Sequence, residues 1–190
     1  MNAIAQTCVL ATTLGLGLVA QGAMIDIDPA NTTVTEGENF DVDINVADLG
    51  DGVAPSLGAF DLTLAFTNNL AFVSAAFGDQ LSPSVSTTTP GANSVNFTEV
   101  SLLDAITLDL AQAASFTLLT ATFQALAPGV AGIDFAGVND LLVDAAGDAL
   151  ADVDFTGASV TVEMADPGQV PLPSTLLLLA LAPLVRFARP

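Results

Sequence analysis

The residues of this sequence that could do chemistry are acidic side chains, which gather around one predicted hairpin at Gly147. Three of them, Asp140, Asp144 and Asp148, lie within nine residues of one another, and more oxygen ligands follow or precede them: Asn139, Asp152 and Asp154. Carboxylate and amide oxygens are the ligands that Ca²⁺ prefers, and exported compartments supply calcium at about millimolar concentration. Asp140, Asp144 and Asp148 are therefore candidate calcium ligands, and calcium is the one cofactor with support in the sequence.

An ordinary acidic hairpin is the alternative interpretation of the same residues. The segment lacks the intervening ligands and the distal Glu of an EF-hand loop. Gly147 would then simply supply the positive φ angle that a tight turn needs.

Catalytic chemistry has little support elsewhere in the chain. The sequence contains no His, and its two basic residues are Arg186 and Arg189, so His-based and Lys-based catalysis are both excluded. Paired carboxylates, as in glycosidases, would be the remaining route. Because 21 acidic residues bring some pairs together by chance, we predict that the protein is not an enzyme.

The charge balance restricts the partners. The chain has 21 acidic and two basic residues, and all the acids lie between Asp26 and Asp166. Such a surface repels phosphate backbones, so we expect no nucleic-acid partner. It would attract Ca²⁺ or a basic partner, or would only keep the domain soluble in a salty medium. Hydrophobic residues make up 52% of the chain, which argues for a folded domain rather than a disordered one.

The elements that would position these acids have the two-residue period of β-strands. Apolar and polar residues alternate over residues 40–46, 60–66 and 160–162, and further strands are predicted at 94–100, 115–126 and 129–135. Residues 102–114 fit a helical turn or a strand with loops, and the pattern leaves both open. Short strands separated by Gly, Asn, Asp and Pro turns predict an all-β fold, a jelly-roll-like β-sandwich.

The order of these segments is similar to that of a cohesin-type domain. The chain opens with Ile25-Asp26-Ile27-Asp28-Pro29, continues through the strand Leu57 to Phe66 and a short Asn68-Asn69 turn, and ends with a hairpin before Val160-Thr161-Val162. The resemblance covers residues 24–165 and implies a jelly-roll-like sandwich. That family includes the receptors that bind dockerin modules in cellulose-degrading assemblies. No local motif marks a dockerin-contacting residue in this chain.

The N-terminus is typical of a secretion signal. The apolar run from Cys8 to Ala20 is too short to span a bilayer, and the small residues Gly22 and Ala23 follow it. We predict a signal peptide over residues 1–23. Cys8 is the only cysteine, so the mature domain would have neither a disulfide nor a thiolate metal site.

The C-terminus, residues 166–190, has the order of features that is typical of a membrane stop-transfer segment: a proline motif, an apolar run and terminal arginines. The residues that carry this motif are Val170, Pro171, Leu172, Pro173, Arg186 and Arg189. The tail resembles the PEP-CTERM sorting signal in its Val-Pro-Leu-Pro variant. The resemblance implies recognition and removal of the tail by an exosortase-type membrane protease, followed by release to the cell surface or extracellular matrix.

Together these features predict an exported, non-catalytic protein with one cohesin-like binding domain, flanked by an N-terminal signal helix and a C-terminal hydrophobic helix. The tail would hold the precursor in the membrane, and the mature domain would meet an extracellular protein or polysaccharide. Two alternatives stay open: a purely structural adhesin or matrix component, and a carbohydrate-binding module. The second is disfavoured because sugar platforms use Trp or Tyr, of which the chain has none, and most of its 11 Phe residues fall on the core phase of strands.

Overall fold

A computed structural model describes residues 22–137 and 140–166. The predicted signal peptide, apart from Gly22 and Ala23, and the sorting-motif residues 170–173, 186 and 189 lie outside these residues, so those assignments stay predictions. In the described part of the chain, no helix is long and apolar enough to cross a bilayer.

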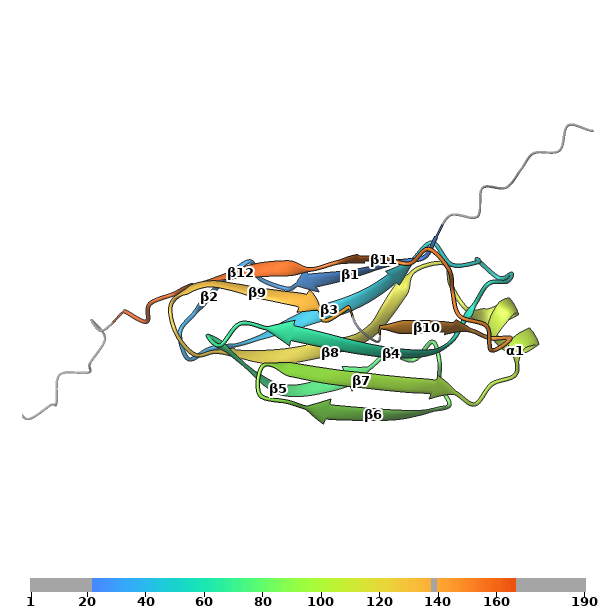
Figure 1. The fold of residues 1–190 in the computed structure, drawn as a ribbon, viewed down its shortest axis with the longest axis horizontal. Helices are drawn as coiled ribbons and strands as arrows, with labels where there is room; N and C mark the ends of the chain where they lie inside the picture. The colour runs from blue at the N-terminus through green and yellow to red at the C-terminus, as the bar shows by residue number, and fades with distance from the viewer. Residues whose placement is uncertain (1–21, 138–139, 167–190) are drawn as a thin grey trace, which may run out of the picture.

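The described residues form a sandwich of two β-sheets, which confirms the predicted fold class (Figure 1). Sheet A has the strand order β11-β1-β3-β8-β5, and its strands are β1 (Met24–Pro29), β3 (Asn39–Ala47), β5 (Leu70–Phe77), β8 (Phe116–Ala125) and β11 (Asp154–Thr156). Sheet B has the order β2-β12-β9-β4-β7-β6, and its strands are β2 (Thr33–Thr35), β4 (Leu57–Phe66), β6 (Ser84–Pro90), β7 (Ser94–Ser101), β9 (Gly129–Phe135), β10 (Leu141–Asp144) and β12 (Ala158–Glu163). β10 pairs with β4, beside β9.

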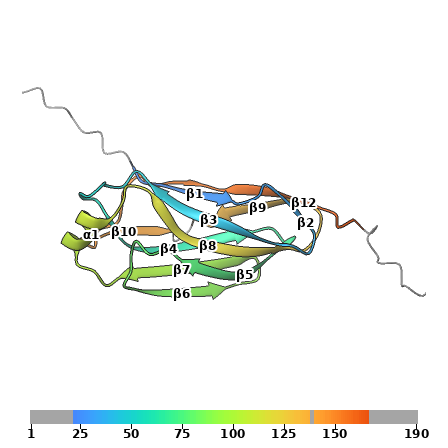
Figure 2. The same cartoon turned by 180° about the vertical axis from the view of Figure 1, so that it is seen from behind.

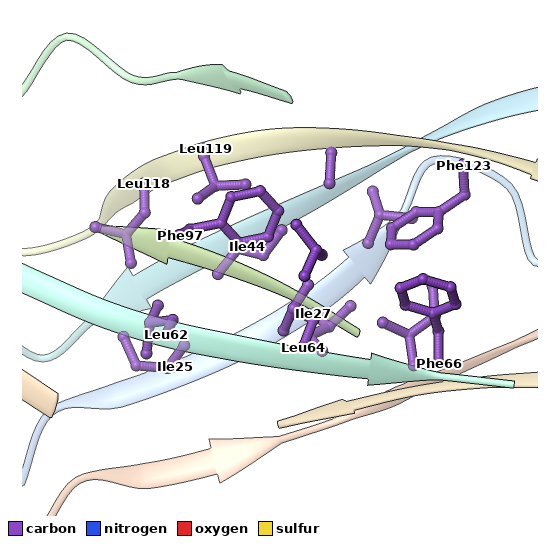
Figure 3. Close-up of a cluster of buried hydrophobic side chains, with 14 of the residues drawn as sticks. Ile25, Ile27, Ile44, Leu62, Leu64, Phe66, Phe97, Leu118, Leu119 and Phe123 are labelled. Carbon is purple, nitrogen blue, oxygen red and sulfur yellow. The ribbon is translucent and has the colours of Figure 1, made fainter. Parts of the chain in front are cut away.

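Alternation along the strands explains why the two sheets face each other. In β4, Phe60, Leu62 and Leu64 are buried while the residues between them are half-buried. β8 contributes Leu119 and Phe123 from the opposite sheet. Figure 3 shows Leu62 and Leu64 of β4 and Leu119 and Phe123 of β8 in the space between the two sheets. Burying apolar faces against each other is the main favourable contribution to such a fold.

Phenylalanine rings gather around Phe123 in this core. The Phe123 ring lies 5.2 Å from Phe66, 5.9 Å from Phe72 and 6.2 Å from Phe40, measured between ring centroids. Edge-to-face pairs at these distances add about 0.5–1.5 kcal/mol beyond the burial of area. Phe40, Phe72 and Phe123 belong to sheet A and Phe66 belongs to sheet B, so the contact between Phe66 and Phe123 joins the two sheets.

The segment that the sequence left open contains a helix, α1 (Ala105–Ala111). Asp104 is its N-cap: Asp104 Oδ1 accepts a hydrogen bond from the Thr107 N–H (3.0 Å) and Oδ2 from the Thr107 hydroxyl (2.8 Å). These bonds, led by the hydroxyl, hold the pKa of Asp104 below its ordinary value. The helix lies next to β10 at one end of the long axis, the end where the described chain starts, and β12 leads toward the other end (Figures 1 and 2).

Candidate functional site

The outer face of sheet B has one row of apolar side chains that crosses four strands. The register pairs Val143 of β10 with Ala59 of β4, Ala59 with Val100 of β7, and Val100 with Val85 of β6. Their neighbours along each strand are on the inner phase, so these four side chains point outward. Val85 is 60% exposed and Val100 is 47% exposed. We name Val143, Ala59, Val100 and Val85 the apolar row; its strands lie side by side in Figure 1.

The two rows next to the apolar row are polar except at one end. The first contains Asp61, Thr98 and Thr87 and begins with the exposed Leu141 of β10, and the second contains Thr63, Asn96 and Thr89. Asn96 links them: its Nδ2 donates to Asp61 Oδ1 (2.5 Å) and to Thr63 Oγ1 (3.1 Å), while its Oδ1 accepts from the Thr98 hydroxyl (3.3 Å). These hydrogen bonds hold the side chains of Asn96 and its partners in fixed positions relative to one another, so an approaching surface meets an ordered pattern of polar groups.

A hollow of about 230 Å³ lies at the α1 end of the apolar row. Ala59, Val100 and Val143 line it together with Leu103, Leu108 and the turn after β10. Gly58 allows that turn to approach β4, because a Cβ at this position would lie 2.6 Å from the Asp144 carbonyl oxygen. The row and the hollow therefore form one apolar depression, which lies beside the hydrogen-bonded polar side chains around Asn96.

The outer face of sheet A is different in charge. Asp41 and Asp43 of β3 lie on it with Asp26 and Asp28 of β1, and β8 supplies the facing hydroxyls. Thr120 donates to Asp43 (2.6 Å) and Thr122 donates to Asp41 (2.7 Å). The described residues include no Lys, Arg or His. Within this part of the chain, the hydrogen-bond donors to these carboxylates are therefore uncharged N–H and O–H groups. Sheet A thus presents the acidic face of the sandwich and sheet B the face with the apolar row.

A buried carboxylate, Glu99, lies directly behind the apolar row. It precedes Val100 in β7, points into the sandwich and is 1% exposed. The Ser84 hydroxyl of β6 donates to Glu99 Oε1 (2.6 Å). Burial raises the pKa of Glu99 above its ordinary value, and the hydrogen bond from Ser84 acts in the opposite direction.

The three predicted calcium ligands are distributed along the segment that enters and leaves β10. Asp140 bridges the gap between β9 and β10: its Oδ1 accepts from the Thr63 N–H (2.7 Å) and its Oδ2 from the Gly137 N–H (2.9 Å). Asp144 Oδ1 accepts from the backbone N–H groups of Ala146 and Asp148, both at 2.9 Å, and so closes the turn at Gly147 (φ 95°). These bonds give Asp140 and Asp144 a role in holding the backbone.

Within residues 22–137 and 140–166, no three side chains of Asp, Glu, His or Cys gather closely enough to hold a metal ion. Calcium binding by Asp140, Asp144 and Asp148 therefore stays a prediction.

Sequence reasoning did not identify the apolar row. In the sequence, this row is visible only as single apolar residues at positions of a strand that face solvent. Ala59 precedes Asp61 and Thr63 in this way, and Val100 follows Asn96 and Thr98. Such a residue is unremarkable by itself. The strand register joins these isolated positions into a continuous feature.

Comparison with known proteins gives a likeness in structure but not in sequence. No protein-family model matches this chain, and no curated protein matches it. Among solved structures, a non-cellulosomal cohesin from the archaeon Archaeoglobus fulgidus aligns with a TM-score of 0.60 at 12% identity, covering 75% of this chain and 92% of that one.

Two domains from Acetivibrio cellulolyticus align equally well. A type II cohesin domain from its cellulosome has a TM-score of 0.61 at 16% identity and covers 74% of this chain and 95% of its own. The third cohesin of ScaC, solved in complex with the ScaB dockerin, has a TM-score of 0.61 at 14% identity, with 75% of this chain and 99% of its own covered. The described part of this chain is a β-sandwich with the cohesin fold.

Proposed function

We propose that this protein is an exported, non-catalytic binding protein whose cohesin-like domain holds a protein partner on the outer face of sheet B. The observation that carries the proposal is the apolar row, Val143, Ala59, Val100 and Val85, next to the ordered polar network of Asn96. Protein interfaces have this anatomy: a small apolar centre that is fully desolvated on binding, with hydrogen-bonding groups around it.

The class of partner to test first is a dockerin module. Four of the similar cohesins were solved with dockerins, which makes that module the natural starting point. Donor groups of the partner would meet Asp61 and the Thr hydroxyls of the polar rows, and an apolar side chain would enter the hollow of about 230 Å³. The acidic character of the whole domain favours a partner with basic residues at its rim.

A pair of matched substitutions tests the surface. Val100→Asp places a charge in the apolar row, and Val73→Asp places the same charge on β5 of sheet A, where Val73 is 49% exposed, against 47% for Val100. Dockerin modules from the same genome would be titrated against each variant. We expect Val100→Asp to weaken binding at least about tenfold, corresponding to about 1.4 kcal/mol, and Val73→Asp to leave it unchanged. Equal affinities for the two variants would contradict the assignment of the surface.

Export and sorting are the second part of the proposal. Support comes from the apolar N-terminal run and from the tail with Val170-Pro171-Leu172-Pro173 and its terminal arginines. Mass spectrometry of the protein from membrane, wall and medium fractions of the host is the test. A product that begins near Met24 and ends near Pro171 to Thr175, outside the cytoplasmic membrane, is expected. A full-length C-terminus retained in the membrane would contradict removal of the tail.

A further inference from the structure

We infer that β6 is a dimerisation edge: two copies of this chain pair their β6 strands antiparallel about a two-fold axis at Ser86. The first observation is the position of β6. It is the last strand of sheet B, and among the described residues only β7 pairs with it. In both views its outer edge lies along the rim of the sandwich (Figures 1 and 2).

The other outer strands have features that discourage pairing with another chain. β2 and β11 have three residues each, and β5 is interrupted by a bulge between Phe72 and Ser74. Short strands and bulges are common ways in which natural proteins protect a sheet edge, and charged side chains are another. β6 has none of them: it pairs with β7 without a register shift over seven residues, and it carries no charge.

The direction of the free backbone groups follows from the hydrogen bonds at the two ends of the strand. The Leu102 N–H donates to the Pro83 carbonyl oxygen (2.8 Å), and the Gly91 N–H donates to the Ser94 carbonyl oxygen (2.7 Å). Odd-numbered residues of the strand therefore bond to β7. Because the register between these ends is regular, even-numbered residues direct their N–H and C=O groups to the free edge.

These groups form a self-complementary set. The even-numbered residues with an N–H are Ser84, Ser86 and Thr88, whereas Pro90 has none. A two-fold axis at Ser86 pairs Ser86 with Ser86 of the second copy and Ser84 with its Thr88. Each such pair exchanges two N–H···O bonds, and a shift of the register toward Pro90 would lose donors. Because the two-fold arrangement occupies the β6 edge of both copies, this contact forms a closed dimer and adds no third copy.

Charge is the reason for choosing a second copy as the occupant. The chain has a formal net charge of −19, so most of its surface repels a copy of itself. The strands at this edge are an exception, because the one ionisable side chain in β6 and β7 is Glu99, which is buried. Repulsion from the rest of the domain is screened beyond about 8–10 Å at 0.1–0.15 M salt, so the dimer should strengthen as salt is added.

Cysteine cross-linking in the full chain tests both the pairing and its register. Cys8→Ser leaves each introduced cysteine as the only thiol. Across the axis, the Cα atoms of the two Ser86 residues would be about 5.5 Å apart, within the range of a disulfide. The two Thr88 residues would be offset by four positions, about 14 Å, which is too far. Both substitutions lie on the same exposed edge, so Thr88→Cys is a matched control for Ser86→Cys.

Under mild oxidation we expect Ser86→Cys to form at least about tenfold more disulfide dimer than Thr88→Cys, with a yield that rises with salt. Equal yields from the two variants, or no dimer from Ser86→Cys in a protein with an unchanged circular dichroism spectrum, would overturn the inference. Absence of a dimer from the folded Ser86→Cys variant would indicate that the β6 edge pairs, if at all, with a strand from another protein. This inference does not depend on the proposed function, because cross-linking at the edge and partner binding at Val100 are measured separately.

Discussion

The side-chain amide of Gln112 pairs with both backbone groups of Leu57, as a neighbouring strand would. The Leu57 N–H donates to Gln112 Oε1 (2.5 Å), and Gln112 Nε2 donates to the Leu57 carbonyl oxygen (3.0 Å). Gln112 is the C-cap of α1, and both residues are buried. The pair attaches the helix to the start of β4, directly beside the hollow at the end of the apolar row.

Gln112→Ala should therefore destabilise the domain strongly. It leaves an N–H and a C=O buried without partners, and each unsatisfied group costs about 1–3 kcal/mol, so we expect a loss of about 2–6 kcal/mol. Chemical denaturation gives the free energy of unfolding. Gln124→Ala is the control, since the Gln124 side chain makes one long bond at the surface, to the Gly37 carbonyl oxygen (3.4 Å). A loss equal to that of the control would show that Leu57 finds other partners.

Glu99→Gln should change how stability depends on pH. Burial raises the pKa of Glu99, so the folded state favours the neutral carboxyl. The stability that this provides is present at acid pH, below the pKa of the unfolded chain, and is lost as pH rises through the raised value. Gln keeps the shape and is always neutral. We expect the variant and the wild type to converge in acid and the variant to be more stable near neutral pH.

Unfolding free energies measured from about pH 4 to pH 8 check this prediction, with Glu163→Gln, at an exposed position of β12, as the control. Parallel pH profiles for wild type and Glu99→Gln would contradict it.

Phe123→Ala should be among the most damaging substitutions in the core. Phe123 has no exposed surface and contacts the rings of Phe40, Phe66 and Phe72. Truncation of a buried Phe costs about 3–5 kcal/mol, a large part of the 5–15 kcal/mol that stabilises a typical domain. Urea unfolding of Phe123→Ala is compared with that of Phe155→Ala, where the side chain is 37% exposed. Similar midpoints for the two variants would contradict the central place of the ring.

Asp140→Ala should cost more stability than Asp148→Ala. Asp140 accepts from the N–H groups of Thr63 and Gly137, so its removal leaves both without a partner where the chain passes from β9 to β10. We expect a loss of about 1–3 kcal/mol, against less than about 0.5 kcal/mol for the exposed Asp148. Calcium titration of the same proteins tests the predicted metal site. A rise in melting temperature with calcium that both variants lose would establish it.

The strands with one buried and one wet face could be predicted from the sequence. In β3 and β4 every second residue is apolar, and that period alone indicates which side chains meet the opposite sheet. β6 could not be found this way, because an edge strand with most of its side chains exposed needs no alternation and its Thr-rich sequence also suits a loop. The helix could not be distinguished from a strand for a similar reason: its seven residues form about two turns, which is too short for a clear period.

By itself, the sequence determined an all-β domain with a carboxylate-rich surface, since alternation and charge are properties of single strands. Tertiary structure decided how the strands align. The apolar row exists because Val143, Ala59, Val100 and Val85 have matching positions in four strands, and a slip of one residue in any strand would turn its side chain to the other face. Register depends on turns, bulges and packing against the second sheet, which are contacts between residues far apart in the chain.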